Sequence, residues 1–368
     1  MSIERSLTHD VPQRLGESWP PAQWRDVHVL AAVSGGADSM ALLAALVEAK
    51  RRHGGAGRIY AGHVNHRLRD DASDADQRWL EGECERMGAP LLVRSCDTMK
   101  LAAAEGDGVE AAARSARYRL LTEMAESVGA RYVAMAHTRD DQIETSLFQL
   151  LRGAGLRGLA GMTFSRALSP SVALVRPLLQ TQRSELREYL NSIGQGHRED
   201  ASNDDPRFAR NRVRLELLPY LREHFNPEVD QAIGRAADFA REAERLIADM
   251  GRDLLAKCQP NVLATGDGVT LQVGPLVEQP EALLVREALR AVWRQAGFGE
   301  QAMSRRCWRQ LAELACGPED SAALNLPGGI RAWREGTMLA LRPSPPAPLP
   351  GVPGIMHPHA WKPHRGDS

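Results

Sequence analysis

Hydrophobic and polar positions in the first half of the chain follow two alternating periods. Short apolar runs of the kind that forms buried strands alternate with longer stretches in which apolar residues recur at helical spacing. Strands are predicted at residues 27–34, 58–66, 89–95 and 131–138, and helices at residues 38–54, 71–88, 108–129 and 140–155. Strands that alternate with helices predict a doubly wound parallel sheet, covered by helices on both faces.

The pattern changes after Leu174. A short strand leads into a capped helix, a polar loop follows, and residues 229–315 are predicted to be mostly helical. Two alternating runs around a Pro-Gly-Gly turn predict a small β element at residues 323–343. We therefore expect a flexible lead-in at 1–24, an α/β domain at 25–225, a mainly helical domain with a terminal β hairpin at 226–343, and a Pro-rich, disordered tail at 344–368.

Composition narrows the class of protein. No apolar run approaches the roughly 20 residues needed to cross a bilayer, and the N-terminus is polar where a signal peptide would be apolar, so we expect a cytoplasmic protein with no membrane partner. The five cysteines form no C-x-x-C pair, which favours reduced, structural thiols. Nearly all positive charge is arginine, which suits RNA, although a GC-rich genome gives the same bias.

The first predicted strand ends in the sequence SGGADS, Ser34 to Ser39. Backbone N–H groups at the start of the following helix would face an anion, and Gly35 and Gly36 would allow positive φ and close approach of a ligand. The Walker and dinucleotide glycine patterns are both absent. The loop therefore predicts a phosphate cradle, with a generic strand-to-helix turn as the alternative.

Four further segments carry candidate chemistry. Asp141 and Glu144 lie three residues apart at a predicted helix start, and an arginine pair, a cationic helix start at 207–214 and a strand end supply other polar groups. These other candidates are His63, Asn65, Arg114, Arg117, His137, Arg207, Arg210 and Arg212. Simpler roles stay open: Asp140 and Asp141 as helix caps, Arg114 and Arg117 as surface ion pairs, and His63 as a structural histidine.

These motifs carry a family resemblance. SGGADS resembles the pyrophosphate-binding loop of the N-type ATP pyrophosphatases, the PP-loop superfamily with its adenine nucleotide alpha hydrolase-like fold. His137, Asp141, Glu144 and Thr145 match the H-x-x-x-D-x-x-E-T signature of the tRNA(Ile)-lysidine synthetases, and residues 65–69 match their N-H-x-L-R run. The segments at 150–162 and 208–214 are also similar, so the resemblance covers about residues 27–229.

The resemblance implies a two-step reaction. ATP would adenylate C2 of the wobble cytidine of tRNA(Ile) with a CAU anticodon, and L-lysine would then attack C2 and expel AMP, forming lysidine. Asp38, Arg114, Asp141 and Glu144 would be catalytic. ATP would bind at Ser34, Gly35, Gly36, Ala37, Asp38, Ser39 and His63.

The resemblance also implies binding roles and partners. Asp38 and Asp141 are its Mg²⁺ candidates. The lysine, Mg²⁺ or tRNA candidates are His137, Asn65, Arg117, Arg207, Arg210 and Arg212. A homodimer is an expectation from the resemblance alone, and an extra C-terminal β domain of longer members is expected to be absent or truncated. The alternatives are another PP-loop adenylating tRNA-modification enzyme and a non-catalytic nucleotide-binding RNA module.

Overall fold

The computed structural model describes residues 11–65, 70–96, 109–198, 209–263, 267–300, 302–318 and 322–344. The chain divides into two compact units, Met1–Ala243 and Glu244–Ser368. The division falls inside helix α11 (Val229–Lys257), after Ala243, and so lies later in the chain than the boundary expected at residue 225. The helix runs without interruption across this division, so the sequence gives no break there.

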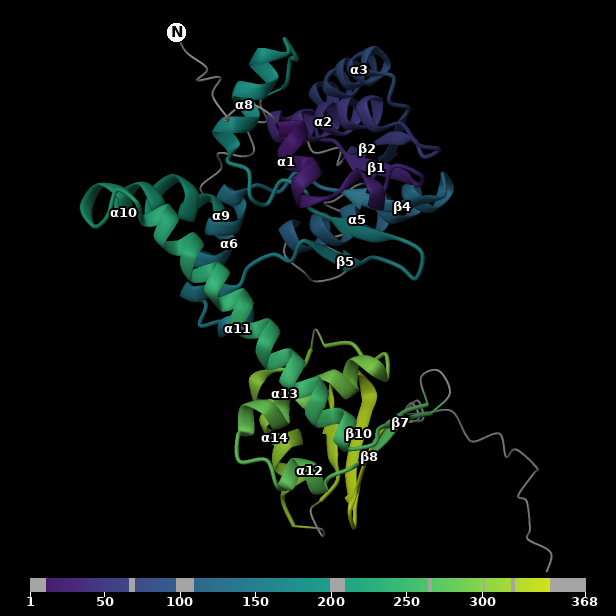
Figure 1. Ribbon diagram of the computed structural model, residues 1–368, viewed down its shortest axis with the longest axis vertical. Helices are drawn as coiled ribbons and strands as arrows, with labels where there is room; N and C mark the ends of the chain where they lie inside the picture. The colour runs from purple at the N-terminus through teal and green to yellow at the C-terminus, as the bar shows by residue number, and fades with distance from the viewer. Residues whose placement is uncertain are drawn as a thin grey trace, which may run out of the picture. The chain divides into compact units, whose positions relative to one another are not determined.

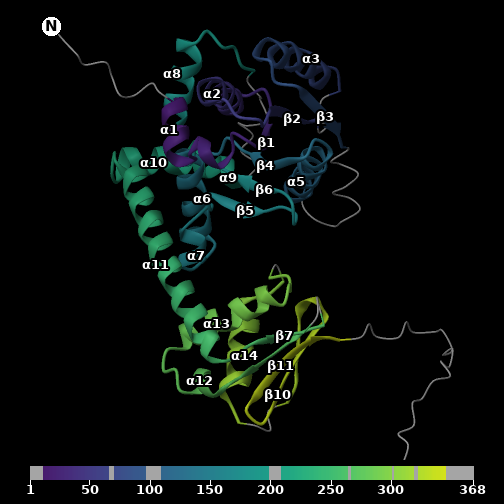
Figure 2. The same ribbon diagram turned by 45° about the vertical axis from the view of Figure 1, so that its right-hand side comes forward.

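The N-terminal unit is built on a six-stranded sheet in the order β3-β2-β1-β4-β6-β5 (Figure 2). The strands are β1 (His28–Ala32), β2 (Ile59–Asn65), β3 (Leu91–Ser95), β4 (Ala130–Ala134), β5 (Ser165–Ala167) and β6 (Ala173–Val175). All neighbouring pairs are parallel except β5 and β6. The predicted parallel sheet is thus confirmed, with one antiparallel edge strand that the sequence pattern did not indicate.

Helices cover both faces of this sheet (Figure 1). On β1, Val29 and Ala31 pack in the cluster that contains α2 (Ala37–His53), whereas Leu30 packs with α5 (Val109–Ser127) on the opposite face. The alternation follows from the period of two in a strand. The other helical segments of the unit are α3 (Asp70–Met87), α6 (Arg139–Leu151), α7 (Leu156–Leu159), α8 (Arg183–Ser192), α9 (Ala209–Arg212), the π-helical turn η3 (Val213–Leu217) and α10 (Leu218–His224).

The segment expected as a flexible lead-in contributes to the core. Helix α1 (Val11–Ser18) buries Val11 and Leu15, and Trp19 and Trp24 are buried in the same cluster. Val11, Leu15 and Trp19 are four residues apart, so they share one helical face. The expectation for residues 11–24 is therefore corrected, while residues 1–10 lie outside the described part of the chain.

The C-terminal unit combines helices with a small antiparallel sheet, as predicted. Its helices are the end of α11, α12 (Gly274–Val277), α13 (Ala282–Gln295) and α14 (Arg305–Cys316). The five-stranded sheet has the order β7-β8-β11-β10-β9, from β7 (Asn261–Val262), β8 (Val269–Gln272), β9 (Leu324–Leu326), β10 (Ile330–Glu335) and β11 (Met338–Pro343). The predicted Pro-Gly-Gly turn joins β9 to β10.

Two strands of this sheet fall in the region predicted to be helical. Strands β7 and β8 are two and four residues long, too short for a period of two to stand out in the sequence. Among the described helices, none is both long and apolar enough to cross a membrane. The Pro-rich tail from residue 345 onward lies outside the described residues.

Candidate functional site

The SGGADS loop links the buried strand β1 to helix α2. Gly35 adopts φ +88°, which requires glycine, whereas Gly36 has φ −71° and serves as the helix N-cap. The expectation of positive φ is therefore right for Gly35 and wrong for Gly36. The first intrahelical bond runs from the Met40 amide to the Gly36 carbonyl, 3.0 Å, so the amides of residues 37–39 have no acceptor within the helix. These amides form an anion-binding helix start.

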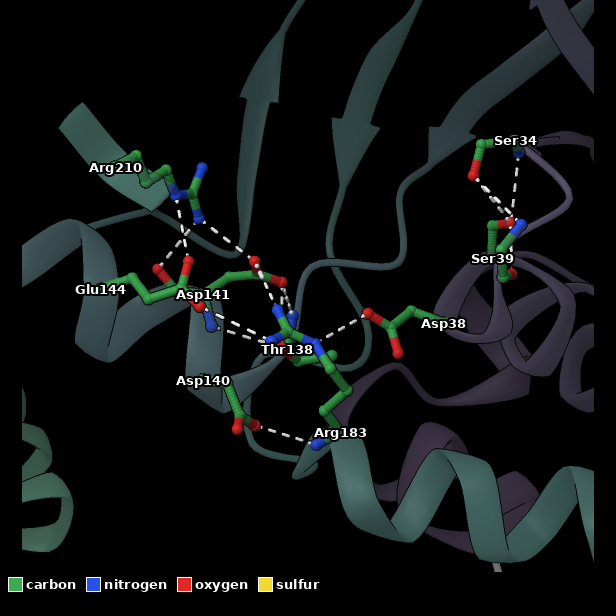
Figure 3. Close-up of polar contacts among 10 residues, drawn as sticks. Ser34, Asp38, Ser39, Thr138, Asp140, Asp141, Glu144, Arg183 and Arg210 are labelled. Atoms are coloured by element: carbon green, nitrogen blue, oxygen red, sulfur yellow. Dashed lines mark hydrogen bonds and ion pairs between the residues drawn. The ribbon is translucent and has the colours of Figure 1, made fainter. Parts of the chain in front are cut away.

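Two serines hold the loop in this shape. The Ser39 hydroxyl accepts a hydrogen bond from the Ser34 amide at 3.1 Å and donates one to the Gly36 carbonyl at 2.9 Å. The two hydroxyl oxygens are 3.2 Å apart (Figure 3). The Arg198 amide donates to the Gly35 carbonyl at 2.9 Å, and Trp79 lies 3.6 Å from where a Cβ on Gly35 would stand. The loop is therefore ordered by its own side chains and by close packing.

Three neighbouring strands bring charged side chains to one place. Strand β4 lies between β1 and β6 and is parallel to both, so their carboxyl ends meet at one edge of the sheet. Asp38 follows β1, Asp141 and Glu144 follow β4, and Arg183 follows β6. The strand order reverses between β1 and β4, which is where open α/β sheets bind ligands. The sheet topology thus joins the glycine loop and the acidic pair in one site (Figure 3).

Asp141 has two roles, one on each carboxylate oxygen. Its Oδ2 accepts hydrogen bonds from the Thr138 amide at 2.8 Å and the Thr138 hydroxyl at 2.9 Å. The Asp141 amide in turn donates to the Thr138 hydroxyl at 3.3 Å, which completes the capping box of α6. Its Oδ1 faces the guanidinium groups of Arg183 and Arg210, each at 3.1 Å. The cap expected as the simple alternative is present, and the same carboxylate still reaches the site.

Arg183 connects all three carboxylates. Its guanidinium lies 3.2 Å from Asp38 Oδ2, 3.1 Å from Asp141 Oδ1 and 3.5 Å from Glu144 Oε1. Its own amide donates to Asp140 Oδ2 at 2.8 Å, so Asp140 caps helix α8 and not α6. A cation at the first position of a helix opposes the helix dipole, and the surrounding carboxylates offset this cost. Arg183 was not among the residues predicted for the site, because its local sequence does not show that its side chain turns toward these carboxylates.

Arg210 lies in the acidic site instead of on the outer surface. Its Nε donates to Glu144 Oε2 at 3.2 Å, and its Nη2 also bonds the Asp141 backbone carbonyl at 3.3 Å. Among the arginines given as lysine, Mg²⁺ or tRNA candidates, Arg210 is thus placed against the acidic pair. Arg212 is exposed, and Arg207 lies outside the described residues.

Burial and charge push the carboxylate pKa values apart. Burial raises the pKa of Glu144, which is 4% exposed, and the neighbouring Asp141 charge adds to the rise. Burial acts on Asp141 in the same direction, but Arg183 and Arg210 outweigh it, so the Asp141 pKa is lowered. Burial also raises the pKa of Asp38, whose Oδ1 is buried with no hydrogen-bond partner. Two carboxylates one turn apart are thus set to different proton affinities.

Two predicted residues lie against the edges of this site. The Arg176 Nε donates to His137 Nδ1 at 3.2 Å, and burial lowers the pKa of His137, so the ring is neutral. His63 Nδ1 lies 2.9 Å from the Val33 carbonyl, directly before the glycine loop. Both histidines therefore contact neighbouring backbone or side chains, and the roles predicted for them in binding stay predictions.

Other predicted residues are placed less centrally. The Arg114 guanidinium lies 5.2 Å from the ring centre of Tyr118. Asn65 donates to Gln77 at 3.3 Å, and Arg117 is exposed. Within the described part of the chain, the ion pairs of Asp38, Asp141 and Glu144 are made by Arg183 and Arg210, not by Arg114.

The fold and the glycine loop define the class of protein to which the chain belongs. The sequence pattern of a family described as the PP-loop domain matches residues 7–221, more than half of the chain, and indicates ATP binding. The U34-tRNA thiolase NcsA from Methanococcus maripaludis has a similar fold, with a TM-score of 0.50 over 63% of this chain and 77% of that one, at 16% identity. This likeness concerns the fold alone.

The relatives narrow the class to one family. A tRNA(Ile)-lysidine synthase from Nostoc sp. is 30% identical, over 85% of this chain and 91% of the relative. One from Solibacter usitatus is 34% identical, over 91% and 70%. The chain belongs to the tRNA(Ile)-lysidine synthase family. It covers 59% of the Thermus thermophilus relative, at 36% identity over 89% of this chain, and therefore spans little more than half of that protein's length.

Proposed function

We propose that the protein ligates L-lysine to C2 of the wobble cytidine of tRNA(Ile) with a CAU anticodon, using ATP. In the first step the C2 carbonyl oxygen attacks the α-phosphorus of ATP, and pyrophosphate leaves. In the second, the ε-amine of lysine forms a bond to C2 while the C2–O bond breaks and AMP leaves. The names of the relatives and the PP-loop match support this reaction.

One observation carries the proposal. The anion-binding loop and a carboxylate pair meet in a single site, with Asp38 and Asp141 bridged by Arg183. Asp38, Asp141 and Glu144 carry three negative charges against the two positive charges of Arg183 and Arg210. The remaining negative charge suits the ammonium group of lysine. The reaction needs a triphosphate and a cationic amine side by side.

The different pKa values of Asp141 and Glu144 suit them to different roles, one in binding lysine and one in accepting its proton. Asp141, whose pKa is lowered, stays ionised and is the group that binds the lysine ammonium. Glu144, whose pKa is raised, holds a proton more readily and is the acceptor that converts the ammonium into a nucleophilic amine. Arg114 remains the candidate for the charge on the activated cytidine and AMP.

Asp38 is the residue that fits a magnesium ion. Its Oδ1 is a buried oxygen without a hydrogen-bond partner, whereas both oxygens of Asp141 are already engaged. Among the described residues no group of three or more His, Cys, Asp or Glu side chains is set to hold a metal. Mg²⁺ is typically held by one or two carboxylates together with substrate phosphates, so Asp38 would be one protein ligand of the ion. When bound, the ion would offset charge on the leaving pyrophosphate.

The experiment is lysine incorporation. Protein, ATP, Mg²⁺ and labelled L-lysine are incubated with tRNA(Ile) of CAU anticodon, and AMP release and label in the RNA are measured. A methionine tRNA with the same anticodon serves as the control. Lysine-dependent AMP release with label in tRNA(Ile) supports the proposal, and the absence of label under all conditions rejects it. The part after residue 229 is proposed to hold the tRNA, and a homodimer is tested by sedimentation of the same sample.

A further inference from the structure

Arg183 occupies the position that the proposed function assigns to a substrate cation. Its guanidinium contacts Asp141 and Glu144, the two groups proposed to receive lysine, at 3.1 and 3.5 Å (Figure 3). The same guanidinium contacts Asp38, within the first turn of the helix that follows the phosphate loop. One side chain therefore touches both substrate sites.

The surroundings allow this side chain to change partners. Arg183 is anchored through its backbone amide to Asp140, while its side chain is 22% exposed and its guanidinium pairs with three carboxylates of the described residues. A triphosphate bound at the amides of residues 37–39 brings several negative charges next to Asp38. A guanidinium forms bidentate hydrogen bonds with phosphate oxygens as it does with carboxylates, so phosphate competes with the three carboxylates for Arg183.

The carboxylates gain from the exchange only if another cation arrives. With Arg183 removed, Arg210 is the one of these two arginines that still pairs with Asp141 and Glu144, so the acidic pair loses a neighbouring positive charge. The vacancy is filled by a single ammonium group. In the described part of the chain Arg210 pairs with Asp141 and Glu144 and not with Asp38, so it has no comparable link to the nucleotide loop.

We infer that Arg183 is a positioning residue that exchanges partners: it covers Asp141 and Glu144 until nucleotide binds, then moves to the phosphates and frees the acidic pair for lysine. This inference rests on the proposed function, because it assumes ATP and lysine as ligands. It makes lysine binding depend on nucleotide and fixes the order in which the two substrates are held.

The test measures lysine affinity directly. Labelled L-lysine is dialysed to equilibrium against the full chain with tRNA(Ile), with and without α,β-methylene ATP, which cannot be cleaved at the reacting bond. We expect the analogue to tighten lysine binding in the wild type by at least about fivefold, a typical coupling between sites. In Arg183→Met the ratio falls to about one, because nucleotide-free protein already binds lysine well.

Controls separate exchange from a structural role. Arg187→Met removes an exposed arginine from the same helix and keeps the wild-type ratio. Steady-state kinetics of Arg183→Met should show a higher KM for ATP and a lower KM for lysine, whereas a misfolded site raises both. Arg183→Lys keeps the positive charge but cannot form two parallel hydrogen bonds, so the ratio of lysine affinities with and without nucleotide should be intermediate. This variant replaces Arg183→Met if circular dichroism shows that Arg183→Met is unfolded.

Two results overturn the inference. One is a wild-type protein that incorporates lysine but binds it equally with and without nucleotide; the other is Arg183→Met with full coupling. Failure of the proposed function looks different, because then no label enters tRNA(Ile) at all.

Discussion

Removing the charge from each member of the acidic pair should move stability in opposite directions. Arg183, Arg210 and Thr138 all donate to the Asp141 carboxylate. In Asp141→Asn the amide nitrogen cannot accept a hydrogen bond, yet it must face either the two guanidinium groups or the Thr138 donors. Two charge-assisted bonds at 3.1 Å are then lost or weakened. Each such bond is worth about 1.5–3 kcal/mol, and the side chains are 16–28% exposed, so we expect a loss of about 2–4 kcal/mol.

The sign for Glu144→Gln is reversed. A carboxylate whose pKa is raised in the folded state costs stability once it is ionised, so a neutral isostere should be as stable as the wild type or more stable near pH 8. The gain appears as pH rises above 4.5, the ordinary pKa of glutamate. The Asp141 contribution is fully present above 3.8 and is lost as pH falls through the lowered folded value.

The assay is urea unfolding followed by tryptophan fluorescence at pH 8 and pH 4, with lysine incorporation measured on the same preparations. Both variants should lose most incorporation, although only Asp141→Asn loses stability. Equal destabilisation by the two substitutions would refute the assignment of different proton affinities to the pair. Full incorporation by either variant would remove that residue from the proposed mechanism.

Three further substitutions and one change of pH probe the site. Asp38→Asn should reduce pyrophosphate release by about a hundredfold or more without lowering the free energy of unfolding, since burial already disfavours the Asp38 charge; unchanged release would place the metal elsewhere. Gly35→Ala should cost about 1–2 kcal/mol of stability because φ is +88°, whereas Gly36→Ala, at φ −71°, should cost little, and urea unfolding of the pair checks this. The kcat for lysine incorporation should fall as pH falls through the raised pKa of Glu144, and a pH profile of kcat without that fall argues against its role as proton acceptor.

The parts of the site that lie within one motif could be predicted from the sequence. The glycine loop and the Asp141–Glu144 pair each follow a strongly apolar strand, and the end of a strand fixes where such residues stand. The cap role and the site role of Asp141 could not be separated in advance, because one carboxylate serves both.

The cationic side of the site depends on tertiary packing. Arg183 and Arg210 come from separate segments, and nothing in their local pattern shows that both turn toward the same carboxylates. Dependence on tertiary packing and short element length also explain why the sequence did not predict helix α1 and strands β7 and β8. Helix α1 is eight residues long and becomes recognisable through its packing on α2, and strands β7 and β8 are too short for their alternation to be distinctive.

The position of the site at the middle of the sheet has a consequence for hydrogen exchange. Strands β1 and β4 each pair with neighbours on both sides, whereas the three-residue edge strand β5 is exposed throughout and pairs with β6 alone among the described strands. Fraying therefore starts far from Asp38 and Asp141, and amides of β1 and β4 should exchange most slowly in the unit. The chemistry would be anchored to the last part of this domain to open.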